Sequence, residues 1–321
     1  MGGWLVAERW MTPELFQDVI NDGEIALVQE LGYEQANKRL NAHRETFITE
    51  KDFKWIANEG FDFVRVPVGH WLFAKTDDFI DGEVYLRKAF GWAAKYKIKI
   101  ILDFHGLQGS QNGLDHSGQV GKVRMYRQGN RSKALQTLEY MCRTYGKHPQ
   151  LIAIEIINEP KVRWFLWRLL RYYDRAIEVA RRHVGEDVKI IISDAFKPRR
   201  IAKAMKRRGY SDQVVLDVHL YQLFSQDDQR LSFDEHIDKV HGEWEVLLHE
   251  LSETVPILVG EWSAALPSYA YDSQSLNEAE KVEIYFRAQQ ELFESVSWAH
   301  SYWSYKAPGA GAWDYHSQSR F

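Results

Sequence analysis

Short runs of apolar residues alternate along the whole chain with segments of helical periodicity. The runs are continuous rather than alternating, and they are rich in β-branched and aromatic side chains, which is typical of parallel strands covered on both faces. The predicted strands are residues 4–8, 61–67, 98–105, 151–158, 188–196, 213–221, 256–262 and 298–305.

The segments between these runs carry helix start and stop signals. Thr49 precedes an acidic first turn and Gly60 follows the last apolar position, which predicts a helix within residues 49–60. Segments 83–97 and 278–295 have the same pattern.

Eight strands alternating with helices predict an α/β fold, a (β/α)8 TIM barrel, as a single domain over residues 1–321. A doubly wound sheet is the alternative. Such a sheet leads us to expect a Gly-rich phosphate loop after an early strand, and the Gly-rich segment 106–113 lacks the G-x-G-x-x-G spacing.

Polar side chains occupy the C-terminal ends of the predicted strands. The carboxyl ends of barrel strands converge on one face, where active sites form. These residues are Arg65, His105, Asn158, Glu159, His219, Tyr221, Glu261 and Trp303. Any one of them has a structural explanation, such as an ion pair or rim packing, but their shared position predicts a polar site.

Two glutamates, Glu159 and Glu261, end the fourth and seventh strands. Paired carboxylates in a polar cleft are the apparatus of glycoside hydrolysis, in which one group donates a proton and the other attacks the anomeric carbon. The same run, LIAIEIINEP at 151–160, also contains Glu155. Strand alternation places Glu155 on the same face but deeper, so we expect a buried, paired residue without a direct catalytic role.

Other chemistries find little support in the sequence. His105, His116 and His219 are not at the spacing of paired metal ligands, so no metal site is predicted. A serine nucleophile is disfavoured because no G-x-S-x-G motif occurs.

Composition narrows the set of partners. The net charge of −4 favours neither nucleic acid nor an anionic membrane, and the basic stretch 197–208 is interpreted as a solvated helix face. The single cysteine, Cys142, is expected in the core. No signal peptide and no apolar run of about 18 residues is visible. We therefore expect a cytoplasmic protein if Met1 is the native start, and a secreted one if the N-terminus is trimmed.

The chain resembles glycoside hydrolase family 5, and within it the fungal exo-β-1,3-glucanases. Motifs matching that family run through almost the whole chain in family order. They are segments 2–16, 43–71, 102–118, 154–160, 217–225, 259–266 and 302–313.

The resemblance implies a role for each matching residue. Glu159 resembles the general acid/base and Glu261 the nucleophile, with Arg65 and Tyr221 holding Glu261 ionised. Asn158 is implied to contact the sugar 2-hydroxyl. The remaining implied sugar contacts are His105, His219 and Trp303 in the first subsite, Glu8 at the closed end of the cleft, and Tyr126 and Phe224 as an aromatic clamp. A cis peptide after Trp303 is also implied.

The expected function is a retaining β-glucosidase or glucanase without a cofactor, acting from the chain end on β-1,3-glucan or its oligosaccharides, and monomeric. The loop after residue 266 is shorter than in the fungal enzymes, which leaves β-1,6- or β-1,4-glucanase, aryl-β-glucosidase and transglycosylase activities open. A non-catalytic carbohydrate-binding barrel is the alternative from another class. The substrate is taken to be neutral, because no basic cluster is visible near the motifs.

Overall fold

The structure, a computed structural model, describes residues 1–162, 165–272 and 276–318. The chain forms two compact units, residues 1–195 and 196–321. The single domain expected over residues 1–321 stays a prediction.

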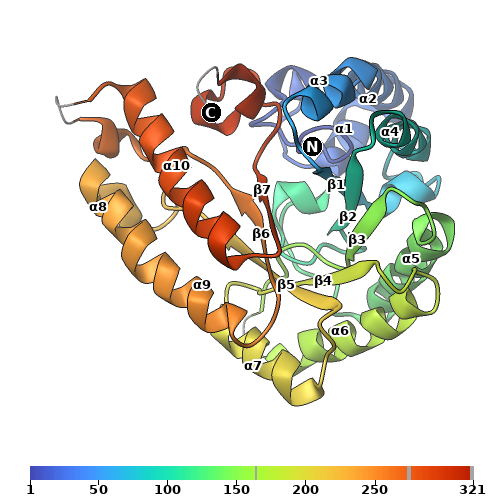
Figure 1. The fold of residues 1–321 in the computed structure, drawn as a ribbon. Helices are drawn as coiled ribbons and strands as arrows, with labels where there is room; N and C mark the ends of the chain where they lie inside the picture. The colour runs from blue at the N-terminus through green and yellow to red at the C-terminus, as the bar shows by residue number, and fades with distance from the viewer. Residues whose placement is uncertain (163–164, 273–275, 319–321) are drawn as a thin grey trace. The chain divides into compact units, whose positions relative to one another are not determined.

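All described strands are parallel to their partners. In the first unit, β1 pairs with β2, β2 with β3 and β3 with β4 (Figure 1). In the second unit, β5 pairs with β6 and β6 with β7. The strands are β1 (Phe63–Gly69), β2 (Lys99–Gly106), β3 (Leu151–Glu155), β4 (Lys189–Ser193), β5 (Val214–Leu220), β6 (Ile257–Trp262) and β7 (Ala299–Tyr302).

Helices separate the strands along the chain, as the sequence predicts. The first unit contains α1 (Glu24–Leu31), α2 (Tyr33–Thr46), α3 (Glu50–Asn58), α4 (Glu83–Tyr96), α5 (Gln128–Tyr145) and α6 (Leu166–Arg181). The second contains α7 (Pro198–Arg208), α8 (Phe233–Lys239), α9 (Glu245–Ser252) and α10 (Glu278–Val296), with a π-helical segment (Val240–Trp244) between α8 and α9. The predicted helices 49–60, 83–97 and 278–295 are confirmed as α3, α4 and α10.

The predicted strand at residues 4–8 is wrong. Trp4, Leu5 and Val6 are buried, as their apolar character requires, but the segment forms turns and bends. Its backbone groups find other partners: the Ala7 amide donates to Glu24 Oε1 at 2.9 Å, and the Glu8 carbonyl accepts from Thr12 in a turn. A buried apolar run needs hydrogen-bonded backbone, and side chains supply that here without a strand.

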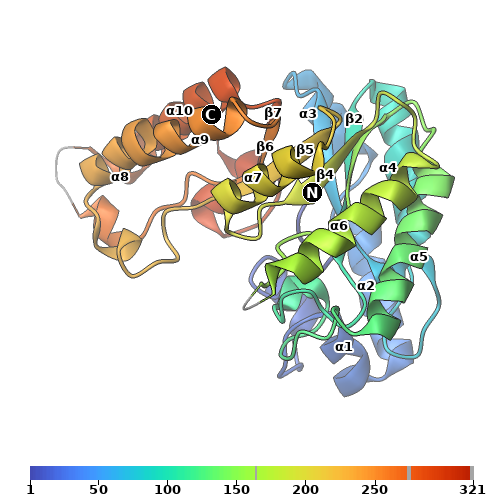
Figure 2. The same ribbon diagram turned by 90° about the horizontal axis from the view of Figure 1, so that it is seen from below.

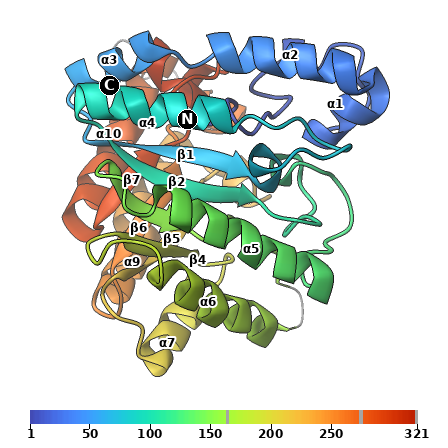
Figure 3. The ribbon, with the colours of Figure 1, turned by 90° about the vertical axis from the view of Figure 1, so that its right-hand side faces the viewer.

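Helices cover the apolar strands of each unit. In the first unit, α4 lies along β2 (Figure 3). In the second, α9 and α10 pack side by side (Figure 2). Every residue of β5 is buried, including Asp217 and His219. Buried polar groups require partners, so these two residues already indicate a polar site on this strand.

Two smaller expectations are confirmed. Cys142 is buried in α5, and burial raises the pKa of its thiol to about 12, which makes it inert. The basic stretch forms α7, which buries Ile201 and Met205 and exposes its cations.

Among the described residues, no helix is both long and apolar enough to cross a bilayer.

A buried ion pair ties α1 to α2. Arg44 Nη2 lies 2.8 Å from Glu24 Oε2, and both side chains are almost fully buried. Arg44 also donates to the carbonyls of Ile80 and Asp81. Burial raises the pKa of the Glu24 carboxyl, and Arg44 offsets part of that shift.

Removing one member of this pair should destabilise the fold strongly, because the other charge stays buried without its partner. We expect Arg44→Met to lower the free energy of unfolding by about 3–5 kcal/mol in urea denaturation. The control is Arg87→Met, which breaks an exposed pair with Glu83 and should cost about 0.5 kcal/mol or less. Equal losses in the two variants would contradict this assessment of Arg44.

Candidate active site

Glu159 lies in the turn that follows β3. The strand ends at Glu155, three residues earlier than predicted, and Glu159 has a φ of 43°. Residues other than glycine rarely adopt this left-handed conformation, and such backbone strain is concentrated at functional sites. Its side chain is 15% exposed, so the carboxylate is both held and accessible.

A chain of polar contacts leads from β2 to Glu159. Asp103 Oδ2 lies 2.6 Å from His105 Nδ1, and His105 Nε2 lies 3.0 Å from His116 Nδ1. His116 Nε2 lies 3.4 Å from Glu159 Oε2. The Asn112 side-chain amide also faces His116 Nε2, at 3.2 Å. His116 is therefore the residue that connects the buried histidine to the candidate acid.

One arrangement of protons satisfies the contacts of His105 with Asp103 and with His116. If Asp103 is ionised, His105 donates through Nδ1 and accepts at Nε2 from His116. His116 then carries its proton on Nδ1, and its Nε2 is an acceptor. An acceptor next to Glu159 Oε2 favours the protonated carboxylic acid, which is the form that a proton donor needs.

Arg65 forms the buried centre of the first unit's polar cluster. Its Nε and Nη2 atoms donate to Glu155 Oε2 at 3.0 and 2.8 Å, and Nη2 lies 3.1 Å from Asp103 Oδ2. Glu155 is fully buried. Glu155 is thus the enclosed, paired carboxylate that the sequence analysis expected, whereas the expected action of Arg65 on Glu261 stays a prediction.

Asn158 is fixed from several sides. Its Oδ1 accepts from Arg65 Nη2 at 3.0 Å, and its Nδ2 lies 3.2 Å from His105 Nε2. The side chain of Gln111 donates to the carbonyls of both His105 and Asn158. These contacts order the turn that carries Glu159.

Glu261 is held by residues of β5 and the segment after it. The register of β5 and β6 pairs His219 with Glu261. The Tyr221 hydroxyl donates to Glu261 Oε2 at 3.0 Å, and His219 Nδ1 lies 3.4 Å from the same oxygen. A hydroxyl donor stabilises the ionised carboxylate, which is the form that a nucleophile needs.

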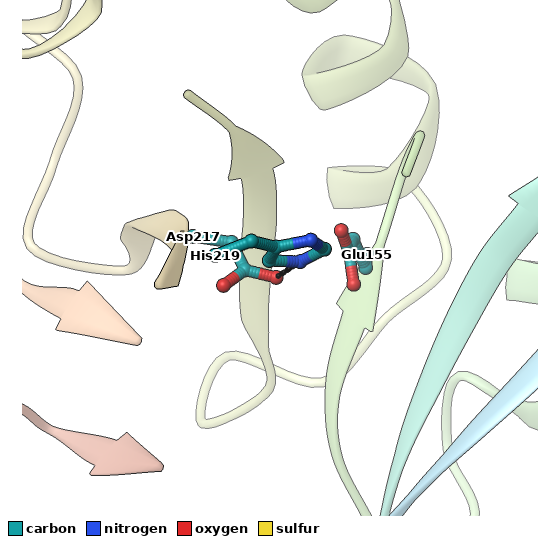
Figure 4. A group of neighbouring side chains, drawn as sticks. All are labelled: Glu155, Asp217 and His219. Carbon is teal, nitrogen blue, oxygen red and sulfur yellow. Dashed lines mark hydrogen bonds and ion pairs between the residues drawn. The ribbon is translucent and has the colours of Figure 1, made fainter. Parts of the chain in front are cut away.

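Asp217 contacts both His219 and the backbone next to Glu261. Its Oδ2 lies 3.3 Å from His219 Nε2, as the dashed line in Figure 4 marks, and its Oδ1 accepts from the Gly260 amide at 2.7 Å. A Cβ at Gly260 would come within 2.2 Å of the Asp217 carboxylate. Glycine before Glu261 therefore permits the close approach that orients His219. Figure 4 also labels Glu155 on β3.

The other predicted sugar contacts are placed as follows. Trp303 is buried, and its peptide bond to Ser304 is cis, as the resemblance implies. Phe224 is 70% exposed and its ring lies 5.4 Å from that of Tyr221. Glu8 is buried and accepts from Trp10 Nε1 at 2.9 Å. Tyr126 is half-buried and its hydroxyl lies 3.4 Å from the Lys161 carbonyl.

The structure adds site residues that the sequence analysis did not assign. Asp103 and Asp217 each lie two positions before a site histidine, on the same face of the strand. The repeated Asp-x-His spacing was a visible signal for both. His116 and Trp313, whose ring lies 5.4 Å from that of Tyr221, carried no comparable signal.

Comparison with known proteins identifies the family. The Cellulase model, described as glycosyl hydrolase family 5, matches residues 25–308. A glucan 1,3-beta-glucosidase of Pichia angusta is 36% identical over 84% of this chain, and this chain covers 64% of that relative. A probable glucan 1,3-beta-glucosidase A of Aspergillus niger is 30% identical over 98% of this chain, and this chain covers 83% of that relative.

Solved structures share the fold. The rutinosidase from Aspergillus niger has a TM-score of 0.81 at 22% identity, covering 98% of this chain and 90% of that one. An endo-glycoceramidase II from Rhodococcus has a TM-score of 0.57 at 17% identity. The match covers 83% of this chain and 70% of that one. The predicted fold class, an α/β fold of the (β/α)8 TIM-barrel type, is confirmed by the family match. The chain belongs to glycosyl hydrolase family 5, a family of enzymes that cleave glycosidic bonds.

Proposed function

We propose that this chain is a retaining β-glycosidase that releases glucose from the ends of β-1,3-glucan or its oligosaccharides. One observation carries the proposal: the two candidate glutamates have opposite hydrogen-bond environments. Glu261 accepts a hydrogen bond from the Tyr221 hydroxyl, whereas Glu159 Oε2 lies 3.4 Å from His116 Nε2, which is an acceptor in the proton arrangement described above. The names of the two relatives support the β-1,3 linkage and the glucosidase activity.

The proposed reaction has two steps. In the first, Glu261 attacks the anomeric carbon while Glu159 donates its proton to the departing glycosidic oxygen, which leaves a glycosyl ester on Glu261. In the second, Glu159 takes a proton from water, the water oxygen bonds to the anomeric carbon, and the ester bond breaks. Both steps invert the anomeric centre, so the released glucose keeps the β configuration.

The remaining site residues take binding roles in the same proposal. Asn158 contacts the 2-hydroxyl of the reacting sugar, where hydrogen bonds strengthen in the transition state. His105, His219 and Trp303 surround that sugar. Glu8 binds the terminal sugar and restricts the enzyme to chain ends, and Tyr126 and Phe224 clamp the next sugar. The protein is proposed to act as a monomer, without a cofactor.

A product profile tests this function. Laminari-, gentio- and cello-oligosaccharides are incubated separately, with Glu261→Ala as the parallel blank. We expect glucose to be released fastest from the laminari series and not at all by the variant. Larger fragments would contradict exo action, faster release from another series would reassign the linkage, and longer products at high substrate concentration would indicate transglycosylation. No turnover in any series would contradict the proposal and favour a binding protein.

The role of His116 makes a separate prediction. His116→Ala should lower kcat/KM by about tenfold to a hundredfold and move the alkaline limb of its pH profile to lower pH, because Glu159 loses the acceptor that favours its protonated form. His116→Gln places an amide oxygen at a similar distance from Glu159. It should restore part of kcat/KM and return the alkaline limb part of the way toward its wild-type pH. A uniform loss with no movement of the alkaline limb would assign His116 a purely structural role.

A further inference from the structure

A basic cavity adjoins the turn that carries Glu159. Its volume is about 510 Å³. Its cationic and aromatic lining includes Lys122, Arg124, Tyr126, Arg127, Lys161 and Arg168. A second cavity, of about 480 Å³, shares Tyr126 and Arg168 with the first and adds further arginines, among them Arg131 and Arg171.

In the part of the chain that the structure describes, the cations of the first cavity form no ion pairs. Within residues 1–162, 165–272 and 276–318, no carboxylate lies within 4 Å of the charged nitrogens of these five side chains. The chain as a whole carries a net charge of −4, so the cluster does not reflect a generally basic surface. Like charges gathered around a hollow repel one another, and a bound anion relieves that repulsion.

Two helix N-termini add to the positive potential. α5 begins at Gln128, directly after Arg127, and α6 begins at Leu166, before Arg168. The first turn of a helix favours acidic side chains, because its free amides carry partial positive charge. Neither helix has an acidic residue in its first turn. Neither first turn therefore supplies a carboxylate of its own to offset this partial charge.

The position of the cavity connects it to the reaction. Lys161 follows Glu159 by two residues, and its backbone amide donates to the Gln111 carbonyl at 2.9 Å. The Gln111 side chain in turn holds Asn158. Because a general acid protonates the leaving oxygen, the leaving group lies next to Glu159, in the same turn that brings Lys161 to the cavity. The cavity is therefore next to the leaving-group end of the substrate.

We propose that this cavity binds an anionic group, a carboxylate, sulfate or phosphate, carried on the leaving-group part of the sugar substrate. This inference rests on the proposed β-glycosidase function and defines its preferred substrate as a β-glucoside that carries an anionic group on the leaving-group part. Tyr126 and Phe165 provide aromatic faces for the sugar ring beside the cations. The sequence analysis assumed a neutral substrate; this lining favours an anionic group on the leaving-group part, because the fold gathers cations from separate segments.

Matched substrates test the proposal. Laminaritriose is oxidised at its reducing end to the aldonate, or reduced there to the alditol, so that the two substrates differ by one anionic group. A second pair carries sulfate or no sulfate on the reducing-end sugar. For the wild-type protein, we expect kcat/KM to be about tenfold higher for the anionic member of at least one pair. That preference should shrink as salt is raised from 50 to 500 mM, roughly as screening predicts.

A charge-neutral variant assigns the preference to the cavity. Arg127→Gln/Lys161→Gln should reduce the anionic-to-neutral ratio of kcat/KM about fivefold to tenfold. The control Lys206→Gln/Arg207→Gln removes the same charge from the exposed face of α7 and should leave the ratio unchanged. Thermal unfolding of both variants confirms that they are folded.

The outcomes separate this inference from the proposed function. Equal kcat/KM for the members of both pairs, with glucose still released, overturns the anionic substrate and leaves the glycosidase intact. If the cavity variant and the control variant lose the preference for the anionic substrate equally, the preference is a general charge effect. That result also overturns the inference. Binding of a single-stranded oligonucleotide that only the cavity variant loses would reassign the cations to nucleic acid. No hydrolysis of any member would instead contradict the function.

Discussion

Glu261→Ala is expected to reduce turnover by about 10⁴- to 10⁶-fold, the range typical of removing a catalytic nucleophile. Alanine has no carboxylate and cannot form the glycosyl ester. Tyr221 and His219 each lose one partner, but the change lies at the end of β6 and His219 keeps Asp217, so the fold should be retained. Initial rates of glucose release from laminari-oligosaccharides measure the effect.

The control for this substitution is Glu253→Ala, which removes an exposed glutamate between α9 and β6. It should preserve the rate, and thermal unfolding of both variants should match the wild type within a few degrees. Residual activity within tenfold of the wild type in Glu261→Ala would show that this carboxylate is not the nucleophile.

Glu159→Ala is expected to lower kcat on oligosaccharides by about 10²- to 10⁴-fold, the usual contribution of general acid/base catalysis. The loss should depend on the leaving group. A dinitrophenyl β-glucoside needs no proton on departure, so the first step should survive and a rapid burst of dinitrophenol should precede slow turnover. Stopped-flow absorbance measures the burst.

Azide provides the second readout. It attacks the glycosyl ester without help from a base, so it should accelerate the variant and yield β-glucosyl azide. Glu186→Ala, which removes an exposed glutamate of the same unit, is the matched control and should show neither burst nor rescue. Equal losses on oligosaccharide and dinitrophenyl glucoside, without azide rescue, would reassign Glu159 to a structural role.

Local sequence signals predicted most of the helices and strands. Thr49 and Asp52 form the capping box that begins α3, and Asn277 and Glu280 form the one that begins α10. Such caps act within one turn, so they are visible in sequence. The same holds for polar residues that end apolar runs, which led to Arg65, His219 and Glu261.

Features that depend on distant contacts were not visible. The segment at 4–8 has the composition of a strand, yet Glu24 and a turn satisfy its backbone. His116 becomes a site residue only because a loop returns it to His105. The basic cavity joins Arg124 and Lys161, which are far apart in sequence, so a search for local basic runs could not find it.

Covalent trapping tests the central claim, that Glu261 is the nucleophile of a retaining β-glucosidase. A dinitrophenyl 2-deoxy-2-fluoro-β-glucoside has a good leaving group and a slow second step, so the glycosyl ester should accumulate. The account predicts loss of activity, one fluoroglucosyl group per chain, and a label on the peptide that contains Glu261. Steady turnover without a label, or a label on any other carboxylate, would contradict it.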